Sequence, residues 1–154
     1  LRRENIASAL EHCNELVSYC RLKGLDAAEY ESHCETLLTR LSRIRNFRAT
    51  RLWDEVVQDR EAAPSRFAAV SLVLTGEAHC RRNTETGNVF LVFSVPGRDE
   101  ARIACRLAPC EPPFMAELEF PCWMAVNGRF LSVSETLILL DPCHYIQSFD
   151  NPPQ

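Results

Sequence analysis

The sequence predicts an α+β protein in which an N-terminal antiparallel helical hairpin precedes a small antiparallel β-barrel. Before Pro64, apolar residues recur at alternating spacings of four and three, which is typical of packed helices. After Phe67, short apolar runs alternate with turn residues, which indicates strands. Asn127-Gly128 lies between two such runs and predicts a two-residue hairpin, because both central residues of a type I′ turn need φ > 0.

Residues 4–23 predict the first helix, and Gly24 fits the position that ends it, since glycine tolerates the left-handed conformation. Asp26 is the expected N-cap of the second helix, and Glu29 completes a capping box. We expect the second helix to run on to about Gln58, before a proline ends it. The short link makes the two helices antiparallel. The apolar seams comprise Ile6, Leu10, Cys13, Val17 and Cys20 in the first helix and Tyr30, Cys34, Leu37, Leu41 and Ile44 in the second.

The rest of the chain predicts short strands separated by turns. Gly76 is expected to mark a bulge or bend in the first of them. Pro113 can start a short helix over residues 114–119. The run at 89–95 is almost continuously apolar, so both of its faces should be covered. The expected strands comprise residues 67–76, 89–95, 101–107, 122–126, 129–133, 136–140 and 143–146.

The expected domains are a helical arm over residues 1–62, a β domain over 63–149 and a disordered tail over 150–154. Residues 67–154 carry 6 basic and 10 acidic side chains, which argues against nucleic-acid binding by bulk electrostatics. No apolar stretch approaches the roughly 20 residues that a membrane span needs. Because the chain opens at Leu1 without a Met, we expect it to be part of a longer protein.

The order of these elements, three meander strands, a short helix and further strands, resembles the OB fold, a five-stranded Greek-key barrel. Residues 128–142 also resemble OB domains of vertebrate genome-maintenance scaffolds, including the SPIDR-type DNA-repair scaffold. The resemblance implies an OB-like barrel and a nuclear setting. Another small β-sandwich or β-barrel with a helical arm is the alternative fold. The resemblance to the OB fold rests on residues 69–76, 89–95, 101–107, 114–119 and 128–146.

Five arginines fall within 12 residues of the expected second helix, with no acidic residue among them. Most of them share one side of that helix at 100° per residue, so we expect a cationic stripe. Three uses stay open: a solvated face paired with Glu11 and Glu15, docking of an acidic protein, or contact with phosphates. Arg81 and Arg82 are further candidate contacts for a partner or a nucleic acid. The stripe comprises Arg40, Arg43, Arg45, Arg48 and Arg51.

Each of the four His residues stands next to a Cys, and both residue types are common zinc ligands. Adjacent residues point about 100° apart on a helix and to opposite faces of a strand, so such a pair rarely binds one ion. The sequence therefore predicts no metal site and no cofactor. The eight cysteines are expected to be reduced core residues. The pairs are His12-Cys13, His33-Cys34, His79-Cys80 and Cys143-His144.

Catalytic motifs do not occur: the sequence has no nucleophile elbow, phosphate-binding loop or dinucleotide fingerprint. Strand alternation places Arg102 and Arg106 on the face away from Cys105, so that thiol lacks the cation that a reactive cysteine needs. Glu117 and Glu119 have no paired acid and are expected to be solvated. We therefore expect neither enzymatic activity nor a small-molecule substrate.

The predicted function is a non-catalytic protein-interaction module of a larger intracellular scaffold, and its nuclear, DNA-repair setting is implied by the resemblance alone. A single-stranded nucleic-acid-binding OB domain is one alternative, with the arginines on the phosphates. Its base-stacking candidates are expected to pack in the core instead, and Phe90 lies in a run too apolar to face water. A helical oligomerisation unit is the other alternative, because the seams could pair between chains. The stacking candidates are Phe90, Phe93, Phe130 and Trp123.

Overall fold

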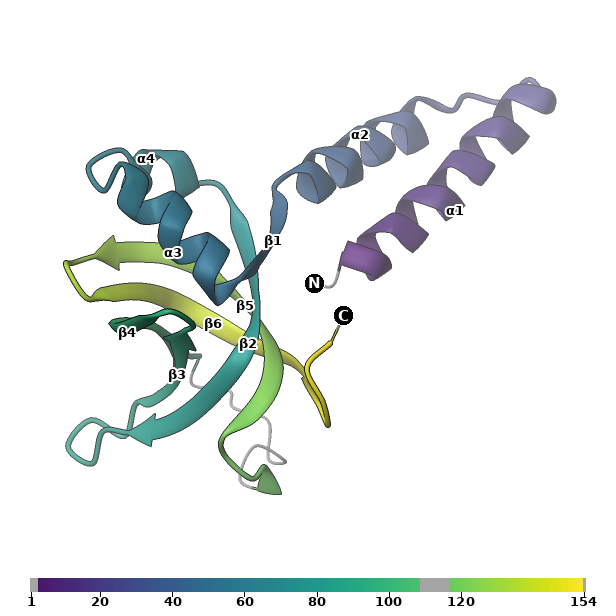
Figure 1. The fold of residues 1–154 in the computed structure, drawn as a ribbon. Helices are drawn as coiled ribbons and strands as arrows, with labels where there is room; N and C mark the ends of the chain where they lie inside the picture. The colour runs from purple at the N-terminus through teal and green to yellow at the C-terminus, as the bar shows by residue number, and fades with distance from the viewer. Residues whose placement is uncertain (1–2, 109–116, 154) are drawn as a thin grey trace. The chain divides into compact units, whose positions relative to one another are not determined.

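The computed structural model describes residues 3–108 and 117–153, apart from the side chains of residues 3 and 4. The chain divides into two compact units, a hairpin unit (Leu1–Ile44) and a barrel unit (Arg45–Gln154). The predicted arm ended later, at residue 62, whereas residues 45–62 belong to the barrel unit. Figure 1 shows the helices and strands along the chain.

The hairpin unit consists of helices α1 (Arg3–Leu22) and α2 (Ala28–Ser42), which lie side by side as the sequence predicts (Figure 1). Gly24 follows α1 with φ of 68°, the left-handed conformation that ends a helix. The N-cap residue of α2 is Ala27, and Asp26 Oδ1 accepts a hydrogen bond from Ala28 N at 3.0 Å. Asp26, which was expected to be the N-cap, therefore precedes the N-cap residue by one position and still satisfies one free amide of the first turn.

The second helix ends at Ser42, so its predicted extension to Gln58 is wrong. Strand β1 (Ile44–Arg48) follows and lies beside β2 in the sheet, and then come α3 (Ala49–Gln58) and α4 (Ala63–Phe67). Phe47 on β1 is buried in the core of the barrel unit. Packing of this aromatic ring and strand pairing outweigh the weak helical preference of the segment. Pro64 does not end a helix but lies in the first turn of α4, where a missing N–H does no harm.

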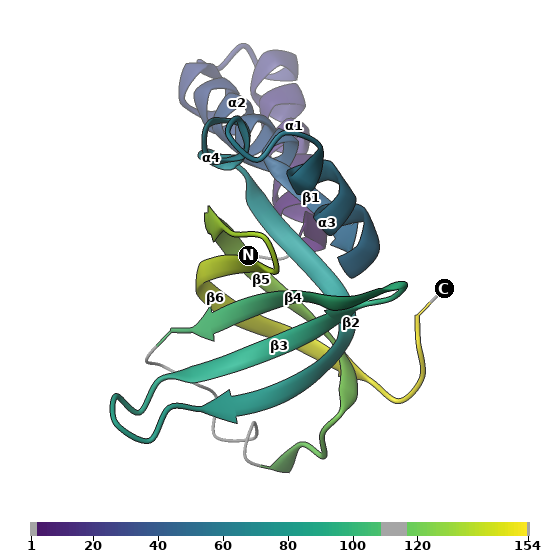
Figure 2. The ribbon, with the colours of Figure 1, turned by 60° about the vertical axis from the view of Figure 1, so that its left-hand side comes forward.

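The barrel consists of β2 (Ser71–Arg82), β3 (Val89–Val95), β4 (Arg98–Leu107), β5 (Cys122–Val133) and β6 (Leu137–Phe149). The strands follow the order β2-β3-β4-β6-β5, and β5 pairs with β2 to close the barrel (Figures 1 and 2). Strands β4 and β6 are parallel and the other barrel pairs are antiparallel. This arrangement confirms the predicted α+β class with a small OB-like barrel, although the barrel is mixed rather than wholly antiparallel.

Asn127-Gly128 does not form the predicted hairpin, because β5 passes through it without a turn. Asn127 pairs with Val73 of β2 and His144 of β6, and its Nδ2 donates to Ser71 Oγ at 2.6 Å. A Cβ at Gly128 would lie 2.6 Å from Cys143 Sγ. This glycine therefore serves the close approach of β5 and β6 rather than a positive φ. The reversal between β5 and β6 falls at residues 134–136 instead.

Other strand boundaries also differ from the prediction. Phe67 ends α4, so the first barrel strand begins at Ser71 and continues to Arg82, while β3 matches residues 89–95. Strand β4 begins at Arg98, three residues before the predicted position. Strand β6 joins two predicted strands, and its pairing with both neighbours shifts register around Asp141-Pro142. A proline is tolerated within a strand at such an irregularity.

At Gly76 the pairing of β2 with β5 shows no register shift, so the expected bulge is not there. A Cβ at this position would lie 3.0 Å from Phe93 Cδ1 in the core, so the absence of a side chain permits close packing. The predicted helix at 114–119 lies mostly outside the described residues. In the predicted tail, residues 150–153 form no helix or strand, and the carbonyl of Pro153 accepts a hydrogen bond from Arg48 Nη2.

The core of the barrel unit is continuous and apolar. Phe67, Phe93, Leu52 and Met124 are among its fully buried side chains, and helix α3 contributes Trp53. Among the described residues, no charged or polar residue is buried. No described helix has the length and apolar character to cross a membrane.

Candidate interaction surfaces

The five arginines of the predicted stripe do not share one helix face. Arg40 lies in the last turn of α2 and Arg43 is its C-cap, both in the hairpin unit. Arg45 and Arg48 lie on β1, and Arg51 lies on α3 in the barrel unit. The predicted stripe is wrong because the helix that would have carried it ends at Ser42.

Arg45 is held within the barrel unit. Its guanidinium contacts Glu55 through two hydrogen bonds of 2.8 and 3.2 Å, and Glu55 also accepts a bond from Arg66 at 3.2 Å. The Arg45 guanidinium carbon lies 4.7 Å from the ring centroid of Phe47. The planar guanidinium of Arg45 contacts both the Glu55 carboxylate and the face of the Phe47 ring. Its bonds to Glu55 hold β1 against α3. Arg45 therefore has a structural role in this fold.

Arg48 and Arg51 also contact aromatic rings. The Arg48 guanidinium lies 5.4 Å from the Trp123 ring centroid, and that of Arg51 lies 5.8 Å from Phe47. Arg48 lines a cavity of about 470 Å³ together with Trp123 and Pro153. Arg45, Arg48 and Arg51 therefore each contact an aromatic ring of the barrel unit.

The outer face of the barrel carries an aromatic ring between two arginines. Arg81 of β2 pairs with Phe90 of β3, which pairs with Arg106 of β4. Directly paired residues lie on the same face of a sheet, so these three side chains form a row. Burial alternates along β3, with Phe90 half-buried between the buried Val89 and Leu91. The prediction that Phe90 packs in the core is therefore wrong.

The charges of this row differ. Arg106 Nη1 lies 3.1 Å from Asp141 Oδ2, which neutralises one end. Arg81 is exposed and makes no ion pair with a residue that the structure describes. Arg82, next along β2, is also exposed. Of the other stacking candidates, Phe93 is fully buried, Phe130 stacks on Phe67 at 5.7 Å between centroids, and Trp123 is half-buried.

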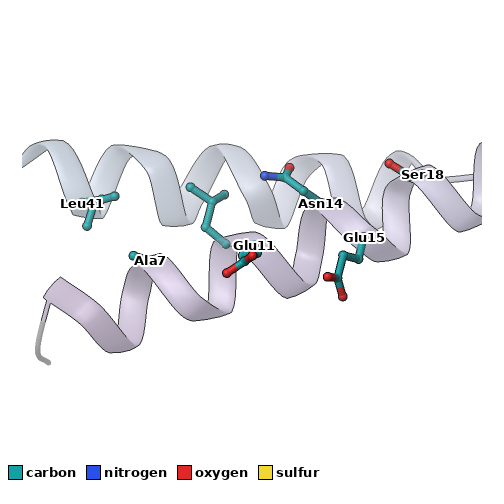
Figure 3. Close-up of a pocket in the computed structure, with 7 residues that line it drawn as sticks. Ala7, Glu11, Asn14, Glu15, Ser18 and Leu41 are labelled. Carbon is teal, nitrogen blue, oxygen red and sulfur yellow. The ribbon is translucent and has the colours of Figure 1, made fainter.

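The hairpin unit has an open groove along one side of α1 (Figure 3). Its volume is about 610 Å³, and its lining residues on α1 are three and four positions apart, which is the spacing of one helix face. Leu41 closes the groove from α2, and both Leu41 and Leu10 are half-buried. The lining residues comprise Ala7, Leu10, Glu11, Asn14, Glu15, Ser18 and Leu41.

The two groove carboxylates make no ion pair with a described arginine, so the structure does not show the pairing that was one of the three open uses of the stripe. Glu11 makes no ion pair with any described residue, and Glu15 contacts only the imidazole of His12, at 3.8 Å. The ion pair that links α1 to α2 is instead Arg21–Glu31, at 2.5 Å. Glu11 and Glu15 are one helical turn apart, so they repel each other on an exposed face.

Large apolar side chains are exposed mainly on the hairpin unit. Among the described residues, Leu22 is 83% exposed and Tyr19 56%, and Leu25 and Leu38 are each 58% exposed. Tyr30 is 38% exposed, whereas the barrel unit exposes Leu131 and Leu137. The sequence placed Tyr30 in the apolar seam of the second helix, but the structure leaves it exposed. The sequence did not show that the other four residues of the hairpin unit would be left uncovered.

Two of the cysteines, Cys105 and Cys34, are poorly suited to nucleophilic chemistry. Burial raises the pKa of the Cys105 thiol, and a hydrogen bond with Cys143 raises it further. A hydrogen bond with Cys13 raises the pKa of Cys34 to about 11. The protonated thiol is a weak nucleophile, so neither residue is activated. No group of three or more potential ligands is placed to hold a metal ion within residues 3–108 and 117–153.

Comparison with known proteins provides no relative from which residue roles could be transferred: no protein-family model matches the chain, and no curated protein is significantly similar to it.

Proposed function

We propose that the chain is a non-catalytic protein-interaction module in which the hairpin unit docks a partner protein. The observation that supports this proposal is the group of exposed large apolar side chains on the hairpin unit: Tyr19, Leu22, Leu25, Tyr30 and Leu38. A single exposed leucine needs no explanation, but several on one small unit mark an interaction surface. Covering one leucine removes enough apolar surface to contribute roughly 1.5–3 kcal/mol.

The barrel unit acts as the stable body that carries this surface. Its buried apolar residues form one continuous core, which stabilises this unit. A module of this kind belongs to a larger intracellular scaffold. The nuclear, DNA-repair setting rests on the resemblance of residues 128–142 alone.

The proposal can be tested with two matched double substitutions in the full chain. Leu22→Ser/Leu38→Ser removes apolar contacts from the hairpin unit, and Leu131→Ser/Leu137→Ser removes the same number from the barrel unit. In quantitative affinity capture from nuclear extract, we expect the first variant to lose the partners that the wild type and the second variant retain. Equal capture by all three proteins would contradict the proposal.

A second candidate function is binding of single-stranded nucleic acid by the barrel. The row Arg81–Phe90–Arg106 favours it, because an aromatic ring between cations can stack a base while the cations contact phosphates. Stacking on one aromatic residue contributes about 1–3 kcal/mol per base. The acidic balance of residues 67–154 argues against strong binding.

This candidate is tested by fluorescence anisotropy with labelled oligothymidylate at several salt concentrations. Phe90→Ala should weaken binding about tenfold, and Arg81→Gln should reduce the salt dependence. Arg129→Gln, an exposed arginine on β5, is the control for the loss of one charge. If Phe90→Ala binds as tightly as the wild type, the barrel row is not a nucleic-acid site.

A further inference from the structure

We infer that the groove of the hairpin unit binds a basic amphipathic helix of a partner protein, which completes a three-helix bundle with α1 and α2. This inference rests on the proposed function and names the kind of partner. Three features of the groove support it: its shape, its apolar residues and its uncompensated negative charge (Figure 3).

The shape of the groove fits a helix. Its α1 residues lie at positions 7, 10, 11, 14, 15 and 18, a continuous stripe of about three turns. The ends of the stripe are small residues, Ala7 and Ser18. Small side chains let the backbone of a second helix approach closely, so ridges of the partner can enter this groove.

Further exposed apolar residues lie next to those that line the groove. Leu22, the most exposed large apolar residue of the described chain, follows Ser18 by four positions and continues the α1 stripe. Leu38 lies three positions before Leu41 on α2 and is also exposed. With Leu10 and Leu41, these leucines provide contacts at the spacing that an amphipathic helix presents.

The hairpin unit alone has little apolar core. No buried aromatic side chain occurs among its described residues, and the buried apolar residues are Ile6, Cys13, Val17, Cys20, Ala27, Leu37 and Ile44. A unit of about 40 residues rarely folds stably without further support. A third helix would bury the exposed leucines and supply that support.

The charge of the groove selects the partner. Glu11 and Glu15 line the groove together with Leu10 and Leu41, and no arginine or lysine among the described residues neutralises them. A second copy of the chain is a poor occupant, because a two-fold dimer would bring the same four carboxylates together. A helix with Lys or Arg beside its apolar stripe would instead pair with both glutamates.

The test uses the full chain and a labelled synthetic helical peptide of about 16 residues, with leucines at i, i+3 and i+7 and lysines beside them. A second peptide carries Glu in place of each Lys. In anisotropy titrations, we expect the basic peptide to bind the wild type and the acidic peptide not to bind. Glu11→Lys/Glu15→Lys should weaken the basic peptide about tenfold or more and should allow the acidic peptide to bind.

The matched control is Glu29→Lys/Glu85→Lys, which changes the net charge equally at exposed positions outside the groove. It should bind the basic peptide nearly as the wild type does. Equal weakening in this control would show bulk attraction and overturn the inference. Absence of binding to the wild type would also overturn it, as would a dimer in light scattering that Leu22→Ser/Leu38→Ser abolishes.

The binding of the acidic peptide that Glu11→Lys/Glu15→Lys should gain keeps the test informative, because a misfolded variant cannot acquire specific binding. The outcome also separates the two proposals. If Leu22→Ser/Leu38→Ser loses partner proteins while Glu11→Lys/Glu15→Lys retains them and binds no peptide, the hairpin docks proteins but the basic-helix inference fails.

Discussion

The hairpin unit and the barrel unit treat their apolar residues in opposite ways. The barrel unit buries Phe67, Phe93 and Met124 completely and leaves two large apolar side chains exposed among its described residues. The hairpin unit buries no aromatic side chain among its described residues and exposes five large apolar ones. A closed barrel leaves no unpaired edge and satisfies its own core, whereas two helices have faces that nothing in their own unit covers. This difference is the basis of our proposal that the barrel unit contributes stability and the hairpin unit docks a partner.

The largest expected effect comes from the barrel core. Phe93→Ala should lower the free energy of unfolding of the barrel by about 3–5 kcal/mol, because the ring is fully buried and leaves a cavity. Both tryptophans, Trp53 and Trp123, lie in the barrel unit, so urea denaturation followed by tryptophan fluorescence reports this loss. Leu37→Ala in α2 is the comparison and should lower helical circular dichroism with little change in the fluorescence midpoint. A common shift of both signals would contradict the independence of the two units.

A smaller effect tests how β5 and β6 approach each other. Gly128→Ala should destabilise the barrel by about 1–3 kcal/mol, because the added Cβ would lie 2.6 Å from Cys143 Sγ. Cys143→Ala removes that atom, so in a double-mutant cycle the alanine at 128 should be better tolerated. Additive losses of unfolding free energy would show that the glycine has another role.

The ion pairs around Glu55 should have a modest effect. Glu55→Gln removes the charge that Arg45 and Arg66 share, and we expect a loss of about 1 kcal/mol because the carboxylate is only partly shielded from water. Asp54→Asn is the matched control. It removes the ion pair with Arg98, and because the Asp54 side chain is more exposed than that of Glu55, this variant should change stability less. Chemical denaturation at low and high salt measures both, and a larger loss in the control would argue against a structural role for Arg45.

The smallest effect is at alkaline pH. Burial raises the pKa of Cys105 in the folded barrel above its ordinary value of 9.0, so the folded state keeps its proton after the unfolded state has lost it. The contribution of the protonated Cys105 thiol to the stability of the folded barrel is complete below pH about 9 and is lost as the pH rises above that value. Denaturation midpoints should therefore fall from pH 9 upward, and Cys105→Ala should reduce that slope. An unchanged slope would assign the alkaline sensitivity to other groups.

Local sequence patterns were sufficient to predict elements whose apolar residues repeat with the period of a single helix or strand. The sequence predicted α1, the stop at Gly24 and β3, because the spacing of apolar residues and the tolerance of glycine for positive φ are local properties. The OB-like barrel class was implied by the resemblance of the element order to the OB fold. Long-range contacts explain the errors. Residues 44–48 pair with β2 instead of extending α2, and that pairing separates the predicted arginine stripe.

The candidate surfaces were predicted in part. Arg81 was identified from its charge, but the exposure of Phe90 depends on the register of β2, β3 and β4, which an almost continuously apolar run does not reveal. Pairing of Glu11 and Glu15 with arginines of the second helix was one of the three uses of the arginine stripe that the sequence left open. Their isolation became visible only with the position of each helix face.

Asn127-Gly128 illustrates most clearly how local sequence signals and long-range packing contribute differently to this fold. The amino-acid sequence alone predicted the helical hairpin, because the spacing of apolar residues is a local property. The small barrel was predicted from the resemblance of the element order to the OB fold. The folded arrangement determined that this glycine lies inside a strand, since only the approach of β6 to β5 leaves no room for a Cβ beside Cys143. It likewise determined which apolar and charged side chains stay uncovered, because exposure depends on neighbours that are distant in the chain.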